Sequence, residues 1–355
     1  MAYQEVSGKY RDRLFHPPFG SFEYLDRLIH GPRDSVTLTS DITLRKGEEE
    51  KYENGIEFEE GSIIIDGAGH TIDARAKASI FRLDAEVYIR NTIIKNGHDA
   101  ISNKGAVKFE ECCFLNNRCA ILNEGKMRVE KCAFTQNRND GGIAGAIVHK
   151  GDDFEINRSA FEANCAGSAG AIFASGSGII WGCDFRKNQG ERAGALYSGN
   201  DLKIMNCKFE ENRAINDSGA ICNRNGDLLV LQSTFRQNIS MKGSGAIFNR
   251  GNLSVDCCDF TDNRAGLCGG AIQNVCNLKI SESMFRYNMS RLRGGAVSSD
   301  GGTLEISDSS FTGNKGAIGE TIVVSRNNVL KLENCDLEDD DVAYHETYPY
   351  CAFSG

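Results

Sequence analysis

Four titratable side chains lie close together near the start of the chain and could supply acid–base chemistry. Asp66, His70, Asp73 and Arg75 all fall in the stretch DGAGHTIDAR. A general acid and a general base of these types, with or without calcium, could cleave an acidic polysaccharide. The stretch is also typical of a tight glycine turn between two strands. We prefer the turn, and a polysaccharide lyase, hydrolase or epimerase using Asp66, His70 and Asp73 is the alternative.

A second candidate is a basic residue that recurs after the sequence Phe-x-x-Asn. This position holds Arg118, Arg138, Arg213, Arg264 and Lys315, while other copies carry Cys165, Gln189 and Ile239. Guanidinium groups in a row can bind carboxylates or sulfates through charge-assisted hydrogen bonds. We therefore expect Arg118, Arg138, Arg213 and Arg264 to bind an acidic glycan or a cell-surface protein, together with the variable loops beside them. The alternative is a solvated face whose charges pair with neighbouring Asp and Glu.

The cysteines do not indicate a metal site. The chain has 14 Cys, but it contains no C-x-x-C pair and no Cys cluster with His at ligand spacing. We expect no metal and no cofactor, and we expect buried free thiols, which favour a reducing or anaerobic setting.

The C-terminal stretch carries an aromatic cluster, which is a third candidate. Its members are Tyr344, His345, Tyr348, Tyr350, Cys351 and Phe353. The cluster could present the tail to a partner or modifying protein, or it could pack over the end of the fold.

A repeat must position all these residues. Gly-Ala-Ile, or a close variant, begins at eight glycines: Gly145, Gly170, Gly194, Gly219, Gly245, Gly270, Gly295 and Gly316. Successive copies are 24 to 26 residues apart, except the last at 21, and two copies without the glycine begin at Asp99 and Cys119. Such a period indicates a solenoid whose units cover one another's apolar faces.

The spacing of apolar residues inside one unit predicts its cross-section. Leu253 and Val255 share one face of a strand, as do Cys258 and Phe260. The odd step between the two pairs requires a corner, and a second corner lies at Asn263. Three short strands per coil predict an all-β, right-handed parallel β-helix of about 12 coils of about 25 residues.

Two stacked columns of side chains should stabilise the corners. Asparagine recurs as Asn117, Asn137, Asn164, Asn188, Asn212, Asn238, Asn263, Asn288 and Asn314. Its amide both donates and accepts, and it tolerates left-handed backbone, so we expect a structural ladder there. Two residues before each phenylalanine, small side chains recur as Cys112, Cys132, Ser159, Cys183, Cys207, Ser233, Cys258, Ser283 and Ser309.

The two ends differ from the repeats and set the domain boundaries. Ser21 can cap a short helix whose apolar face would cover the first coil. We predict an N-terminal arm and capping helix over residues 1–34, the β-helix over 35–337, and a C-terminal cap and tail over 338–355.

Charge and hydropathy exclude some partners. The net charge of −9 argues against nucleic acid, which needs a clustered basic surface. No run of eighteen apolar residues or signal peptide is evident, so we expect no membrane span. The oligomeric state and the compartment stay open.

The repeat resembles that of polymorphic outer-membrane proteins and of archaeal adhesin-like proteins. The likeness rests on GAIFN with FTDN, and on GAIQN with FRYN. The opening segments GSFEYLDRLI and IIIDGAGHTIDA resemble the archaeal group in particular. This resemblance covers about residues 19 to 337 and implies a non-catalytic, adhesin-like β-helix displayed at a cell surface. We recognise no signal peptide, autotransporter barrel or wall anchor of that family among these 355 residues.

Overall fold

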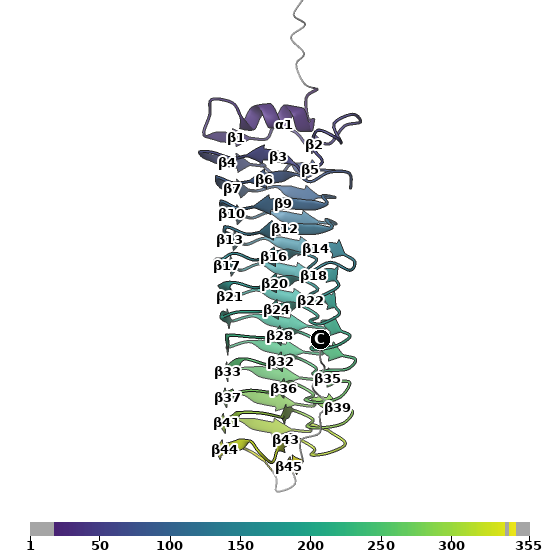
Figure 1. Cartoon of the computed structure of the whole chain (residues 1–355), viewed down its shortest axis with the longest axis vertical. Helices are drawn as coiled ribbons and strands as arrows, with labels where there is room; N and C mark the ends of the chain where they lie inside the picture. The colour runs from purple at the N-terminus through teal and green to yellow at the C-terminus, as the bar shows by residue number, and fades with distance from the viewer. Residues whose placement is uncertain (1–17, 338–340, 346–355) are drawn as a thin grey trace, which may run out of the picture.

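The chain folds into a right-handed parallel β-helix of about 12 turns with one short helix at its first end. The structure, a computed structural model, describes residues 18–337 and 341–345. All strand pairs are parallel and join one coil to the next, so the molecule is a rod (Figure 1). The predicted fold class is confirmed.

The first sheet has 13 strands and forms one side of the rod. In most of its strands alternate side chains are buried, as the two-residue period requires. The strands are β1 (Ser35–Thr37), β4 (Ser62–Asp66), β7 (Glu86–Arg90), β10 (Ala106–Glu110), β13 (Lys126–Glu130), β17 (Asp153–Asn157), β21 (Ser177–Trp181), β25 (Leu202–Met205), β29 (Asp227–Leu231), β33 (Asn252–Asp256), β37 (Leu278–Ser281), β41 (Thr303–Ser307) and β44 (Val329–Glu333).

The second sheet has 12 strands, most of which bury one central side chain, usually phenylalanine. The strands are β2 (Ile42–Thr43), β5 (Thr71–Asp73), β8 (Ile93–Lys95), β11 (Cys113–Leu115), β14 (Ala133–Thr135), β18 (Ala160–Glu162), β22 (Asp184–Arg186), β26 (Lys208–Glu210), β30 (Thr234–Arg236), β34 (Asp259–Thr261), β38 (Met284–Arg286) and β42 (Ser310–Thr312).

The third sheet has 13 strands and carries the isoleucine of the Gly-Ala-Ile motif. The strands are β3 (Ile56–Phe58), β6 (Phe81–Leu83), β9 (Asp99–Asn103), β12 (Cys119–Asn123), β16 (Ile147–His149), β20 (Ile172–Ala174), β24 (Leu196–Ser198), β28 (Ile221–Asn223), β32 (Ile247–Asn249), β36 (Ile272–Asn274), β40 (Val297–Ser299), β43 (Ile322–Ser325) and β45 (Val342–His345).

A fourth sheet, which the three-strand cross-section did not predict, lies between the second and the third. It has 7 strands of two residues each, and each strand begins directly after a ladder asparagine. The strands are β15 (Arg138–Asn139), β19 (Cys165–Ala166), β23 (Gln189–Gly190), β27 (Arg213–Ala214), β31 (Ile239–Ser240), β35 (Arg264–Ala265) and β39 (Met289–Ser290). It starts where the segment between the asparagine and Gly-Ala-Ile lengthens, because the early coil runs straight from Asn117 into β12.

The glycine of Gly-Ala-Ile is required by the close approach of neighbouring coils. A Cβ on Gly245 would lie 2.0 Å from the carbonyl oxygen of Gly270 and 2.6 Å from the backbone nitrogen of Arg264. Both neighbours are backbone atoms and cannot move aside, so only glycine fits.

The asparagine ladder forms as predicted. The Oδ1 of Asn263 accepts hydrogen bonds from the backbone nitrogen of Asn238 at 3.1 Å and from its Nδ2 at 3.0 Å. The Nδ2 of Asn263 donates to Phe235 O at 2.8 Å and to Asn288 Oδ1 at 2.9 Å. The left-handed residue at this corner is the one before the asparagine, such as Asp262 with φ 58°. The asparagine therefore acts through its side chain and not through its backbone tolerance.

The column of small residues also forms. Backbone N–H groups donate along it, for example from Cys132 to Ser159 Oγ at 3.0 Å and from Cys183 to Cys207 Sγ at 3.4 Å. The described cysteines are free thiols, and each Cys-Cys pair has one fully buried member, Cys112 or Cys258.

A second ladder at the end of the third sheet was not predicted. Asn223 Nδ2 donates to Asn249 Oδ1 at 2.8 Å, and Asn249 Nδ2 donates to Asn274 Oδ1 at 2.7 Å. His149 replaces asparagine in this column, and its Nδ1 accepts from Asn123 Nδ2 at 2.8 Å. The sequence signal was the asparagine two residues after the motif isoleucine.

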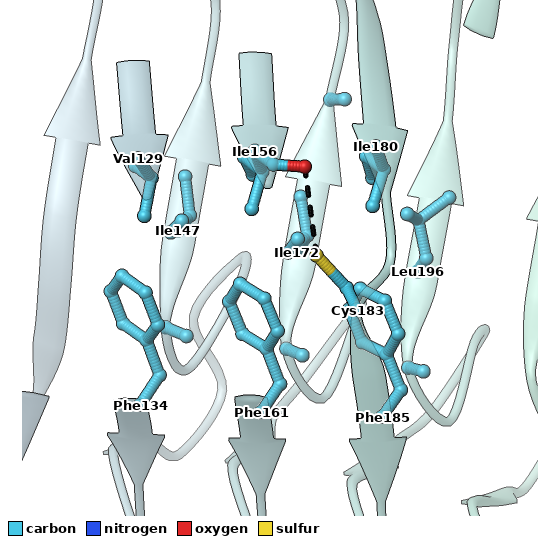
Figure 2. Packing of buried hydrophobic residues seen from close by; sticks show 14 of the residues in the cluster. Val129, Phe134, Ile147, Ile156, Phe161, Ile172, Ile180, Cys183, Phe185 and Leu196 are labelled. Carbon is cyan, nitrogen blue, oxygen red and sulfur yellow. Dashed lines mark hydrogen bonds between the residues drawn. The ribbon is translucent and has the colours of Figure 1, made fainter. Parts of the chain in front are cut away.

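Phenylalanine rings fill the interior beside these ladders. From Phe114 to Phe311 the rings of successive coils are stacked with centroids 4.6 to 4.9 Å apart. Figure 2 shows three of these rings, Phe134, Phe161 and Phe185, and the Cys183 thiol donating to the carbonyl oxygen of Ile156. The spacing between strands sets the spacing between rings, so one core runs through the whole rod.

The capping helix α1 (Phe22–Ile29) forms where it was predicted and lies over the first coil (Figure 1). The Ser21 hydroxyl accepts from the backbone nitrogen of Tyr24 at 3.1 Å. Phe22, Leu25 and Ile29 are buried, which closes the apolar end of the solenoid.

The last coil corrects one part of the repeat alignment. The copy predicted at Gly316 is wrong, because Ile322 pairs with Val297 and Gly295 N–H donates to Glu320 O. Ile318 instead lies 45% exposed in a loop. The third sheet continues to His345 through β45, which pairs with β43, so regular structure extends past residue 337.

Candidate functional site

The recurring basic position lies on the fourth sheet and is in register from coil to coil. Starting at Arg138, the residues that pair from one coil to the next are Cys165, Gln189, Arg213, Ile239, Arg264 and Met289. Lys315 follows Met289 through a single bridge. The residues predicted to interrupt the row, Cys165, Gln189 and Ile239, do interrupt it, and so does Met289, which was not predicted. Arg118 follows its ladder asparagine in a coil that has no fourth-sheet strand and leads directly into β12.

The four predicted arginines are all exposed but differ in their partners. Arg118 lies 4.0 Å from Asp99, and the Nε of Arg138 lies 2.9 Å from Asp140. Within residues 18–337 and 341–345, neither Arg213 nor Arg264 has an ion pair. Among the described residues, Arg213 and Arg264 are thus the arginines of the row that make no ion pair.

Two adjoining hollows lie along the row. One, of about 330 Å³, is lined by Arg213, Gln189, Ile215 and Met241 among others, and also by Asp140 and Glu191. The other, of about 560 Å³, is lined by Ile239, Ser240, Met241, Arg264, Ala265, Gly266, Met289 and Arg291. Met241 contributes to both, so we treat them as one groove, the "basic groove".

The second hollow combines positive charge with apolar surface. Its lining holds two arginines and no carboxylate. Met241 is 70% exposed and Met289 is 46% exposed. Small residues, Ser240, Ala265 and Gly266, leave the space open. Arg291, which sequence reasoning missed, comes from the loop after β39 and has no repeat position that would have marked it.

The chemistry of the basic groove is that of anion recognition. A guanidinium group binds a carboxylate or sulfate with two parallel hydrogen bonds, and the apolar side chains between the arginines can pack on uncharged parts of a ligand. Exposed ion contacts are individually weak and are screened by salt, so several would have to act together.

The acid–base group near the start of the chain is spread over two sheets. Asp66 ends β4 in the first sheet, and Asp73 ends β5 in the second. Within the described part of the chain, no hydrogen bond or ion pair joins Asp66, His70 and Asp73 to one another.

Each carboxylate instead stabilises a turn and the coil beside it. Asp66 accepts from the backbone nitrogen of Ala68 at 2.9 Å and pairs with Arg90 at 2.9 Å. Although burial opposes its ionisation, the donors Ala68, Asn91 and Arg90 together lower the pKa of Asp66. Asp73 accepts from Arg75 N–H and from Asn96 Nδ2, both at 2.8 Å. These contacts are those of a strand-ending turn.

His70 has a different acidic partner from those predicted. Its Nδ1 lies 3.3 Å from Asp41 Oδ1. The backbone N–H of Thr71, helped by His70, lowers the pKa of Asp41. Asp41 and Arg75 also line a hollow of about 580 Å³ together with Arg45 and Lys46. A histidine–aspartate pair beside a basic hollow is thus present, built from residues other than Asp66 and Asp73.

Two members of the C-terminal aromatic cluster belong to β45. Tyr344 is 59% exposed, and His345 Nε2 lies 3.0 Å from Asp300, which also pairs with Arg293. Tyr348, Tyr350, Cys351 and Phe353 lie outside the described residues.

The residues that the structure describes contain no group of three or more His, Cys, Asp or Glu side chains arranged to hold a metal ion. None of their helices has the length and hydrophobicity needed to cross a bilayer.

Comparison with known proteins identifies a family by sequence pattern. A family model described as "Right handed beta helix region" matches residues 144–337, which is more than half of the chain. Comparisons with curated proteins and with solved structures give no significant match.

Proposed function

The chain belongs to the right-handed β-helix family, and on this basis we propose that it is a non-catalytic, adhesin-like scaffold that binds an acidic glycan through its basic groove. The observation that carries the proposal is the hollow lined by Arg264 and Arg291 with apolar side chains and no carboxylate. The repeat resemblance to polymorphic outer-membrane and archaeal adhesin-like proteins supports a binding role. A cell-surface protein with an acidic patch is the other partner that this surface fits.

A binding assay tests this proposal directly. Immobilised acidic and neutral polysaccharides are probed at low and at physiological salt with the intact chain and with the double variant Arg213→Gln/Arg264→Gln. We expect binding to acidic polymers only, falling with added salt, and weakened several-fold in the double variant. The control is Arg236→Gln/Lys279→Gln, which removes two exposed charges from β30 and β37 on other sheets. Unchanged binding in the groove variant would contradict the proposal.

A carbohydrate-active enzyme on the same fold is the second candidate. The His70–Asp41 pair beside the basic hollow is the observation that favours it. A histidine hydrogen-bonded to a carboxylate can act as a general base, and nearby arginines can hold an acidic substrate.

Turnover separates the two candidates. We expect no release of reducing or unsaturated ends from polyuronates, with or without calcium. Sustained release that is lost in His70→Ala would establish the enzyme instead. The variant Asp73→Asn serves as the control, because its carboxylate holds the turn and, among the described residues, makes no hydrogen bond or ion pair with His70.

A further inference from the structure

In the fourth-sheet column that runs past the basic groove, cations and apolar side chains alternate from one coil to the next. The fourth-sheet register places Arg213, Ile239, Arg264, Met289 and Lys315 on successive coils in one column. Neighbouring parallel strands are about 4.8 Å apart, so successive cations in this column are about 9.6 Å apart along the rod. Such a spacing selects for a polymer whose charges repeat at the same interval.

We propose that the basic groove recognises a linear polysaccharide built from disaccharides in which one ring carries a carboxylate or sulfate and the next is uncharged. This inference rests on the proposed function and specifies its ligand. One sugar ring of an extended polysaccharide is about as long as the distance between neighbouring coils. The charged rings then face Arg213, Arg264 and Lys315, and the uncharged rings face Ile239 and Met289.

The apolar positions are what discriminate against a fully charged polymer. If every ring carried a carboxylate, every second one would lie against Ile239 or Met289, whose side chains offer no hydrogen-bond donor in return for the lost water. Arg291 stands two residues after Met289 on the same coil, so this penalty falls mainly on the ring at Ile239. An uncharged ring instead buries its C–H face on the Ile239 and Met289 side chains. The ligand with fewer charges should therefore bind more tightly, the reverse of simple ion attraction.

The same spacing argues against an extended acidic peptide. Side chains on one face of a β-strand repeat at about 6.8 Å, about 2.8 Å less than the spacing between cations, so neighbouring side chains of a peptide could not both lie opposite a cation. Arg291 lines the same hollow as Arg264 but stands on the next coil, two residues after Met289. It supplies a second guanidinium for a carboxylate or sulfate held in that hollow.

The test compares defined oligosaccharides of equal ring number by titration calorimetry at low salt. One alternates uronate with an uncharged ring, the second is a polyuronate, the third is neutral, and poly-glutamate serves as the peptide. We expect the alternating oligosaccharide to bind at least five-fold more tightly than the polyuronate. The variant Ile239→Arg/Met289→Arg should reverse this preference, because it places a cation on every coil, while Lys279→Gln should leave it unchanged.

The outcomes separate this proposal from the one it rests on. Equal or tighter binding of the polyuronate, with both acidic glycans losing affinity in Arg213→Gln/Arg264→Gln, would overturn the alternating register but keep the acidic-glycan groove. Tighter binding of poly-glutamate would assign the groove to an acidic polypeptide. No binding of any acidic polymer would overturn both proposals.

Discussion

At the scale of the residue, His149 stands in the second ladder in place of an asparagine. Its side chain is fully buried and its ring lies 4.5 Å from that of Phe154. Burial lowers the pKa of His149, outweighing the nearby Asp153 and Asp152. Because Nδ1 accepts from Asn123, the neutral ring carries its proton on Nε2, and a second proton would disrupt the ladder.

This arrangement predicts an acid-sensitive step in stability. The folded pKa lies below the unfolded value of about 6.5, so the unfolded chain binds the proton more readily, and stability falls as pH drops below about 6.5. Urea midpoints at pH 7.5 and 5.5 should therefore differ more for the original chain than for His149→Asn, which keeps the ladder without titrating. An equal difference in the two proteins would show that the folded and unfolded states bind a proton at His149 equally well, so that folding does not lower its pKa.

Asn263 tests whether the first ladder stabilises the corners. Its removal leaves the backbone nitrogen of Asn238 and the carbonyl of Phe235 without their partners inside the rod. We expect Asn263→Ala to lower the free energy of unfolding by about 1 to 3 kcal/mol, measured by urea denaturation. Asn252→Ala is the matched control, because this asparagine is exposed at the start of β33. Equal losses in both variants would contradict a special role for the ladder.

At the scale of the element, α1 closes the first coil through one narrow face. Leu25 is fully buried, whereas Leu28 is only partly buried on the same helix. We expect Leu25→Ala to cost about 2 to 5 kcal/mol of stability and Leu28→Ala clearly less. Thermal denaturation gives the comparison, and size-exclusion chromatography should show self-association when the first coil loses its cover. Similar melting temperatures for both variants would mean that α1 is not a cap.

At the scale of the whole molecule, each coil contacts only its neighbours, so position along the rod decides the effect of a mutation. Phe209 is fully buried between the rings of Phe185 and Phe235. Phe311 is 7% exposed, and among the described residues its ring stacks on Phe285 alone. We expect Phe209→Ala to cost about 3 to 5 kcal/mol and Phe311→Ala less, both measured by urea denaturation. Equal costs would show that the rod unfolds as one unit regardless of position.

The sequence by itself determined the coil and its ladders. The period near 25 residues, the odd step between Val255 and Cys258, and the column through Asn263 predicted the solenoid and its corners, because each coil repeats the same local contacts. The basic column was also predictable in register, down to Ile239 as an interruption. Local spacing is enough where every neighbour is a copy of the same unit.

Only the tertiary structure decided what surrounds those columns. The spacing could not show that Arg138 is paired with Asp140 while Arg213 is not, or that Arg291 joins Arg264 in one hollow, because these contacts depend on loops whose sequences differ from coil to coil. His70 pairs with Asp41, 29 residues away, because stacking brings distant loops together. The Gly-Ala-Ile motif at Gly316 gave a wrong repeat alignment for the last coil. In the structure, the residues that pair with the preceding coil are Glu320, Thr321 and Ile322.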